Sequence, residues 1–171
     1  MRGIRRLLPV LRTLVYVVLF AWGWSWVISS VARLDPRAGD HMPAWLEPIG
    51  YVLVFAGCAL MLVCVFAFAV RGRGTPAPMD APRQLVIWGP YRSVRNPIYV
   101  GLVAALVGMG LILRSPAVLI LAGITWALTH LLVVLYEEPT LKRRFGESYV
   151  AFTEQVNRWV PRRPVVAAGE V

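Results

Sequence analysis

Four long stretches of the sequence carry no formally charged residue, and they restrict the fold more than any other feature. They span residues 13–32, 48–70, 97–113 and 115–136. At 1.5 Å per residue, helices of these lengths can cross a hydrocarbon core of roughly 30 Å, the third only barely. The composition agrees, because 58% of the residues are hydrophobic and only 16% are charged. The sequence therefore predicts an all-α integral membrane protein with about four transmembrane helices.

Arginine and lysine residues are distributed unevenly among the segments that flank these stretches. Most precede the first stretch, lie between the second and third, or follow the fourth: Arg2, Arg5, Arg6, Arg12, Arg71, Arg73, Arg83, Arg92, Arg95, Lys142, Arg143, Arg144, Arg158, Arg162 and Arg163. Arg33, Arg37 and Arg114 fall on the other side. Cytoplasmic segments of membrane proteins carry the excess of basic residues. We therefore expect a multi-pass protein of the inner (plasma) membrane with cytoplasmic N- and C-termini.

The same distribution accounts for the net charge of +9. Basic residues at the membrane surface contact anionic lipid headgroups, so the lipid bilayer, and not nucleic acid, is the expected partner of this charge. The first stretch could alternatively be a cleavable signal peptide, because a basic start and an apolar run precede "SVA" at 30–32. Its length and its tryptophans, Trp22, Trp24 and Trp26, favour a retained membrane helix.

Three regions are expected along the chain. Residues 1–82 hold the first two helices and a basic linker, 83–163 hold the third and fourth helices with an amphipathic helical segment, and 164–171 form a disordered tail. The amphipathic segment is predicted from apolar residues spaced three or four apart, which suit a helix on the membrane surface or a folded-back lid, broken near Gly146. These residues are Leu141, Phe145, Tyr149, Phe152 and Val156.

The third and fourth helices are expected to form an antiparallel hairpin. Asn96 is a favoured N-cap residue and Pro97 suits the first helical position. The sequence "LRSP" at 113–116 then indicates a tight turn with a proline opening the next helix. This hairpin brings residues 96–101 and 136–139 to one face of the membrane.

Acidic residues follow the fourth apolar stretch directly. Glu137 and Glu138 are expected at the C-terminal end of that helix, where the helix dipole disfavours negative charge. His130 lies seven residues before Glu137, on the same helix face. The glutamates could simply face water, and His130 could be a neutral ring bonded to a carbonyl of a neighbouring helix. The alternative is a ligand site that requires negative charge.

Positive charge is expected to face these carboxylates. Arg92 and Arg95 precede the free N–H groups at the start of the third helix, and guanidinium with helix N-terminal N–H groups binds carboxylate or phosphate. Lipid headgroup contact remains the alternative for the arginines. A ligand with both charges and a diol, such as S-adenosylmethionine, suits such a site, although spacing alone does not separate it from other zwitterions.

Three motifs carry a resemblance to a known family. They are "GPYRSVRNPIYVG" at 89–101, "LYEEPTLKRRFGESYVAF" at 135–152 and "VNRWVPR" at 156–162. Residues 83–163 resemble the C-terminal half of the membrane methyltransferases that include isoprenylcysteine carboxyl methyltransferase and the phospholipid N-methyltransferases. The resemblance implies an S-adenosylmethionine pocket that opens to the cytoplasm, with a lipid-like acceptor entering from the bilayer.

The resemblance and the charge argument together give a set of expected site residues and no metal. The cofactor-binding residues are expected to be Arg92, Arg95, Asn96, Tyr99, Gly101, Glu137 and Glu138. The expected catalytic residues are Arg95, Tyr99 and His130. A weaker tail pattern matches at Arg144, Phe145, Tyr149 and Arg158.

Specific roles follow as hypotheses. Arg95, with Arg92, is expected to bind the cofactor carboxylate, and Glu137 its ribose or ammonium group. Glu138 is expected to hold Arg95 or Arg144 in place. Tyr99 would form a wall of the methyl site, and His130 or a glutamate would be the base for an amine acceptor.

The acceptor class is open. Asn96 stands where the carboxyl methyltransferases typically have His, which favours an amine headgroup, although Asn also caps a helix well by itself. Alternative functions are a small-thiol methyltransferase of the same fold, or a non-enzymatic membrane protein or transporter.

Overall fold

The computed structural model describes residues 2–36, 42–67 and 87–162, with only the course of the helix given for 2–14. Within these ranges the regular structure is entirely helical, as predicted. Its elements are α1 (Arg2–Arg33), η1 (Ala44–Leu46), α2 (Glu47–Ala67), η3 (Gly89–Arg92), α3 (Pro97–Ile112), α4 (Pro116–Leu132), the π-helical segment η4 (Val133–Glu137), α5 (Glu138–Phe145) and α6 (Glu147–Gln155). The tail at 164–171 and most of the predicted linker lie outside the described residues.

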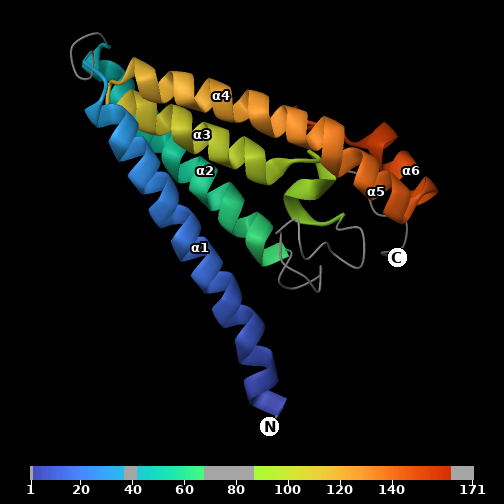
Figure 1. The fold of residues 1–171 in the computed structure, drawn as a ribbon. Helices are drawn as coiled ribbons and strands as arrows, with labels where there is room; N and C mark the ends of the chain where they lie inside the picture. Colours follow the sequence, from blue (N-terminus) through green and yellow to red (C-terminus); the bar gives the residue numbers. More distant parts are fainter. Residues whose placement is uncertain (1, 37–41, 68–86, 163–171) are drawn as a thin grey trace.

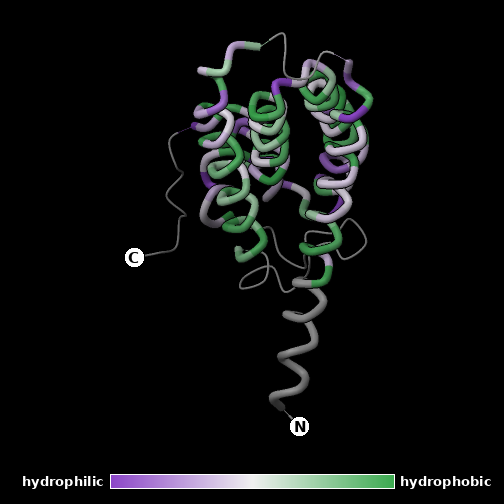
Figure 2. The backbone as a smooth tube through the Cα atoms, turned by 90° about the vertical axis from the view of Figure 1, so that its left-hand side faces the viewer, coloured by the Kyte–Doolittle hydropathy of each residue, from purple (hydrophilic) through white to green (hydrophobic). Residues whose placement is uncertain are grey.

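Among the residues that the structure describes, three helical segments are long and apolar enough to cross a membrane, namely Val15–Arg33, Ala44–Ala67 and Pro116–Phe145. The third predicted span, α3, is apolar but has only 16 residues, about 24 Å at the helical rise. Figure 2 shows that hydrophobic residues predominate along the helices. Large apolar side chains are exposed there, including Trp22 at 69% and Phe55 at 78%, as expected for surfaces in contact with lipid.

Helices α2 and α3 pack very closely because glycines face each other. A Cβ atom at Gly108 would lie 2.6 Å from the carbonyl oxygen of Gly50, and one at Gly101 would lie 2.7 Å from that of Gly57. Small residues allow this approach of backbones in membrane helix pairs. Gly101 is therefore buried against α2.

The turn between α3 and α4 is fixed by hydrogen bonds. Ser115 caps α4, its Oγ accepting from Val118 at 3.3 Å, and its hydroxyl donates to the carboxylate of Asp35. The N–H of Ala117 also donates to Asp35 at 3.0 Å. Asp35 thus places negative charge at the positive end of α4. The segment that follows α1 is thereby hydrogen-bonded to the start of α4.

Different segments of the chain form the two ends of the helical bundle. Figure 1 shows the segment after α1, the start of α2 and the α3–α4 turn together at one end, with α5 and α6 at the other. The predicted antiparallel hairpin is confirmed. Helix α1 contributes Ile28 to a small core with Leu102, Leu106, Val118 and Ala122, and its N-terminal half diverges from the other helices (Figure 1).

Candidate active site at the polar end of the bundle

The fourth apolar helix does not end at Glu137 and Glu138, as the sequence suggested. It passes through the π-helical segment η4 and continues as α5 to Phe145. The ring of Pro139 would clash with the carbonyl four residues earlier in a regular α-helix, and a locally wider turn relieves this conflict. The expectation that the helix dipole disfavours these carboxylates was therefore wrong. Single-turn π segments recur at functional sites.

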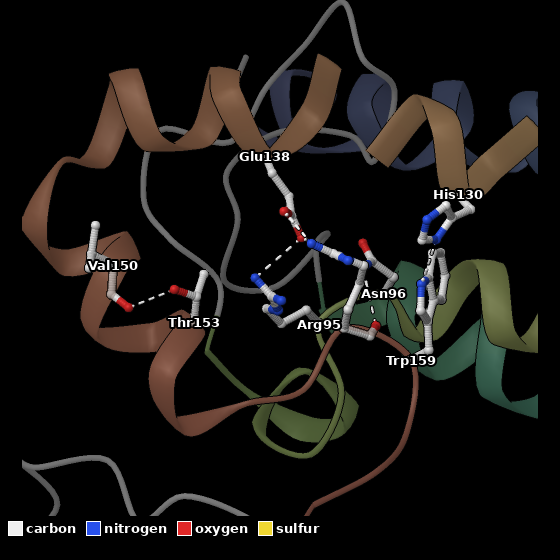
Figure 3. A network of polar contacts seen from close by, with 8 residues as sticks. Arg95, Asn96, His130, Glu138, Val150, Thr153 and Trp159 are labelled. Carbon is white, nitrogen blue, oxygen red and sulfur yellow. Dashed lines mark hydrogen bonds and ion pairs between the residues drawn. The ribbon is translucent and has the colours of Figure 1, made fainter. Parts of the chain in front are cut away.

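Glu138 lies between two arginines. Its Oε1 is 3.2 Å from Nη1 of Arg95. Arg158 donates from Nε to Oε1 at 2.7 Å and from Nη2 to Oε2 at 2.9 Å. Figure 3 shows the side chains of Arg95 and Glu138 next to each other. Such two-pronged pairing fixes orientation as well as charge, and the bond to Glu138 raises the pKa of Arg158 above its ordinary value.

Arg95 and Arg158 are brought together by pairing of the segments that carry them. Val94 and Asn157 form a parallel bridge, in which the N–H of Arg95 donates to the carbonyl of Asn157 at 2.9 Å. The N–H of Arg162 donates to the carbonyl of Ser93 at 2.8 Å. The motif before α3 and the motif after α6 therefore meet through their backbones.

Asn96 occupies the predicted N-cap position of α3, but its side chain makes no capping hydrogen bond. Its amide instead donates to the carbonyl oxygen of Arg158 at 3.2 Å. The interpretation of Asn96 as a side-chain cap was wrong. The residue instead joins the start of α3 to the segment after α6.

Tyr99 and Glu137 are joined across the hairpin. The Tyr99 hydroxyl donates to Oε1 of Glu137, and both side chains are half-buried. Glu137 and Glu138 thus have different surroundings, since Glu138 contacts two cations and Glu137 a neutral phenol. Tyr99 on α3 and Glu137 on η4 confirm that the two predicted clusters are spatial neighbours.

His130 is bonded to a tryptophan and not to a carbonyl. The indole N–H of Trp159 donates to Nδ1 of His130 at 3.0 Å, as Figure 3 shows. The His130 ring also stacks on Trp126, with centroids 5.6 Å apart. Because an indole nitrogen only donates, Nδ1 must carry no proton in this arrangement.

An apolar cavity of about 310 Å³ lies beside these groups. It is lined by Tyr99, Val100, Val103, Ala104, Trp126 and Trp159. Helix α3 supplies one wall, α4 a second and the segment after α6 a third. Tyr99 belongs both to this cavity and to the hydrogen bond with Glu137, so the cavity begins next to the charged groups.

The predicted amphipathic segment is confirmed, with its break at Gly146, whose φ is +54°. The apolar residues that predicted it all contribute to one cluster, together with Ile87. The segment is therefore folded back on the chain before α3. Burial raises the pKa of Tyr149, and the negative charge of Glu138 adds to the increase. Arg144 is exposed and lies over the ring of Phe145, so Glu138 is held by Arg95 and not by Arg144.

The segment before α3 packs against the end of α2. Tyr91 is only 8% exposed and packs with Cys64 and Ala67 at the end of α2. Arg92 ends η3, just before the bridge at Val94. The predicted cofactor contacts of Arg92 and Gly101 stay predictions.

The weaker tail pattern included Arg158 without assigning it a partner, and Trp159 was not predicted as a site residue. Both lie in the tail motif "VNRWVPR", and the basic side chain beside an aromatic was the available signal. Their partners, Glu138 at the start of α5 and His130 on α4, are 20 and 29 residues away in sequence. In the part of the chain that the structure describes, no group of three His, Cys, Asp or Glu side chains could hold a metal ion.

The fold and this charged end define a helical membrane protein with a partly buried polar site at one end of its bundle. Comparison with protein families is more specific. The chain belongs to the phospholipid methyltransferase family, whose model matches residues 47–148. The match begins with α2, and so reaches further toward the N-terminus than the motifs suggested, and it ends within α6. No curated protein sequence matches the chain.

Proposed function

We propose that this protein is an S-adenosylmethionine-dependent methyltransferase that acts on a lipid-like acceptor in the membrane. Membership of a methyltransferase family supports the reaction class. The observation that carries the cofactor assignment is Nε of Arg95, which among the described residues is buried without a hydrogen-bond partner. Leaving such a donor unsatisfied costs about 1–3 kcal/mol, and more when the group is charged. A carboxylate of a ligand would remove that cost.

The other side chains also fit the cofactor. Glu137 accepts from Tyr99, and a carboxylate can accept several further hydrogen bonds. It is therefore suited to ribose hydroxyls or to an ammonium group. S-adenosylmethionine carries a carboxylate, an ammonium group and a ribose, which match the donor at Arg95 and the acceptor at Glu137.

Each residue has a defined part in this proposal. Arg95, assisted by Arg92, binds the cofactor carboxylate, and Glu137 binds its ammonium or ribose. Glu138 is a positioning residue that holds Arg95 against Arg158. When bound, the cofactor supplies an electrophilic methyl group. The protein contributes mainly by orienting donor and acceptor and by excluding water.

The acceptor enters from the bilayer through the apolar cavity, where Tyr99 forms the wall nearest Glu137. An amine acceptor would have to lose a proton, whereas a carboxylate or thiolate would not. Nδ1 of His130 is engaged by Trp159, so His130 can accept a proton there only after that bond breaks. Glu137 is then the better placed base for an amine.

Calorimetry with S-adenosylhomocysteine tests the cofactor assignment. We expect the detergent-solubilised protein to bind it, and Glu137→Gln to weaken binding at least tenfold because the neutral amide is a poorer acceptor. The matched control is Glu147→Gln, an exposed acid at the start of α6, which should bind like the unaltered protein. Absence of heat at saturating ligand with the unaltered protein would favour the non-enzymatic alternative or a transporter.

A labelled-methyl assay on membranes then separates the acceptors. Phospholipid amines, prenylcysteine analogues and small thiols are offered in parallel. Transfer to a lipid acceptor is the expected result. Transfer to the small thiol alone would contradict the lipid-like acceptor and favour a thiol methyltransferase of the same fold.

A further inference from the structure

We propose that Trp159 determines how wide an apolar chain the acceptor cavity admits, and that His130 is the positioning residue that holds Trp159 in place. The inference rests on the proposed function, since it concerns the acceptor of that same site. It assigns His130 a role other than that of a base.

The cavity suits part of a hydrocarbon chain. Its lining consists of aliphatic side chains from α3 and the rings of Tyr99, Trp126 and Trp159. Its volume of about 310 Å³ lies at the lower end of ligand pockets, roughly 300–1,000 Å³. It can therefore enclose the portion of a lipid next to the reacting group, while the remainder stays in the bilayer.

Trp159 is the cavity wall that does not belong to the helical hairpin. Its position depends on the hydrogen bond to His130 and on ring contact with it, at a centroid distance of 5.9 Å. His130 is itself stacked on Trp126. The two tryptophans that line the cavity thus both contact one imidazole ring, and this arrangement sets the spacing between their walls.

The backbone that carries Trp159 is held by the charged network. Arg158, the preceding residue, is paired with Glu138, and its carbonyl accepts from Asn96. Trp159 consequently cannot be displaced without straining the contacts of its neighbour. Trp159 is therefore held both by its own side-chain contacts and by the contacts of the preceding residue. A wall held in this way is suited to rejecting chains that are too wide.

The experiment is photolabelling in vesicles that contain two diazirine probes, one with a straight alkyl chain and one with a branched isoprenoid chain. In the unaltered protein we expect the straight probe to label residues lining the cavity more than the branched probe does. Trp159→Ala should raise the ratio of branched to straight labelling several-fold, and Trp159→Phe should raise it less. The control is Trp26→Ala, which removes an exposed indole from α1 and should leave the ratio unchanged.

His130 is tested in the same assay. His130→Ala removes the acceptor of the indole N–H and should change the ratio in the same direction as Trp159→Ala. His130→Gln keeps an acceptor and should restore much of the original ratio, which a merely structural loss would not explain. If Trp159→Ala does not fold, Trp159→Phe and the two His130 variants still test whether Trp159 sets the width of the cavity.

The outcomes separate this inference from the proposed function. An unchanged ratio in the Trp159 variants, or cavity labelling no stronger than that of exposed Phe55 on α2, would overturn the inference. Binding of S-adenosylhomocysteine is measured separately, on the unaltered protein. If the unaltered protein does not bind it while the labelling ratios change as expected, the methyltransferase proposal fails and the chain-selecting cavity stands.

Discussion

Two adjacent glutamates, Glu137 and Glu138, have different contacts, although the sequence offers no reason to distinguish them. Glu138 is 20% exposed and lies between Arg95, 13% exposed, and Arg158. Glu137 contacts the neutral hydroxyl of Tyr99. A carboxylate already paired with two cations has little capacity for a ligand, whereas one bonded to a phenol retains it. This difference supports the proposal that Glu138 positions Arg95 and that Glu137 binds the ligand.

Replacing Glu138 should therefore cost stability. Glu138→Gln leaves both guanidinium groups without their carboxylate, and hydrogen bonds to charged groups contribute roughly 1.5–3 kcal/mol. We expect a lower thermal unfolding temperature in detergent and weaker binding of S-adenosylhomocysteine. Glu147→Gln serves as the control with unchanged unfolding. Normal stability and normal binding in Glu138→Gln would contradict the supporting role.

At the scale of elements, α2 and α3 approach each other backbone to backbone. Cβ atoms at Gly50 or Gly108 would each meet a backbone carbonyl oxygen within 2.7 Å. Backbone atoms cannot rotate away as a flexible side chain can, so the helices would have to separate. Because α3 begins at Pro97, directly after Arg95 and Asn96, a shift of this helix also shifts the site.

Alanine substitution measures this contact. Overpacking of this kind typically costs 1–3 kcal/mol, so Gly108→Ala should lower the unfolding temperature and also weaken cofactor binding. Gly123→Ala on α4 is the matched control, because a Cβ there meets nothing within 4 Å. It should be neutral or stabilising by about 0.5–1 kcal/mol. Equal unfolding temperatures for the two variants would show that the close approach does not limit stability.

Sequence patterns predicted the helical elements well and their junctions less well. The proline at 97 and the turn before Pro116 are local signals, and both helix starts are confirmed. Helix α4 continues through η4 into α5 because a π turn accommodates Pro139. Such a π turn has no local sequence signature. The bonds of Arg158 and Trp159 join residues far apart in sequence. Periodicity reports which face of a helix is apolar, and not which distant side chain that face meets.

For the whole molecule, the charge distribution predicts which end of the bundle faces the cytoplasm. The segment after α1 and the α3–α4 turn lie at one end, and α5 and α6 at the other (Figure 1). The positive-inside rule assigns the second end to the cytoplasm. The site would then face the compartment where a soluble cofactor is available.

Cysteine labelling in intact cells tests this orientation. In a background with Cys58 and Cys64 replaced, a cysteine at the exposed position Leu34 should react with a membrane-impermeant maleimide. A cysteine at Val150, also exposed but on α6, should react only after the cells are permeabilised. The opposite pattern would reverse the assigned topology, and labelling of both in intact cells would rule out a single orientation.

The pairing of Val94 with Asn157 also bears on how the protein is made. A chain that emerges from the ribosome N-terminus first places its apolar helices in the membrane before residues 157–159 have been synthesised. Until then Arg95 lacks its backbone partner, Glu138 lacks Arg158 and the cavity lacks its third wall. A nascent chain of this protein therefore lacks these contacts, and the proposed site is completed only after translation has passed Trp159.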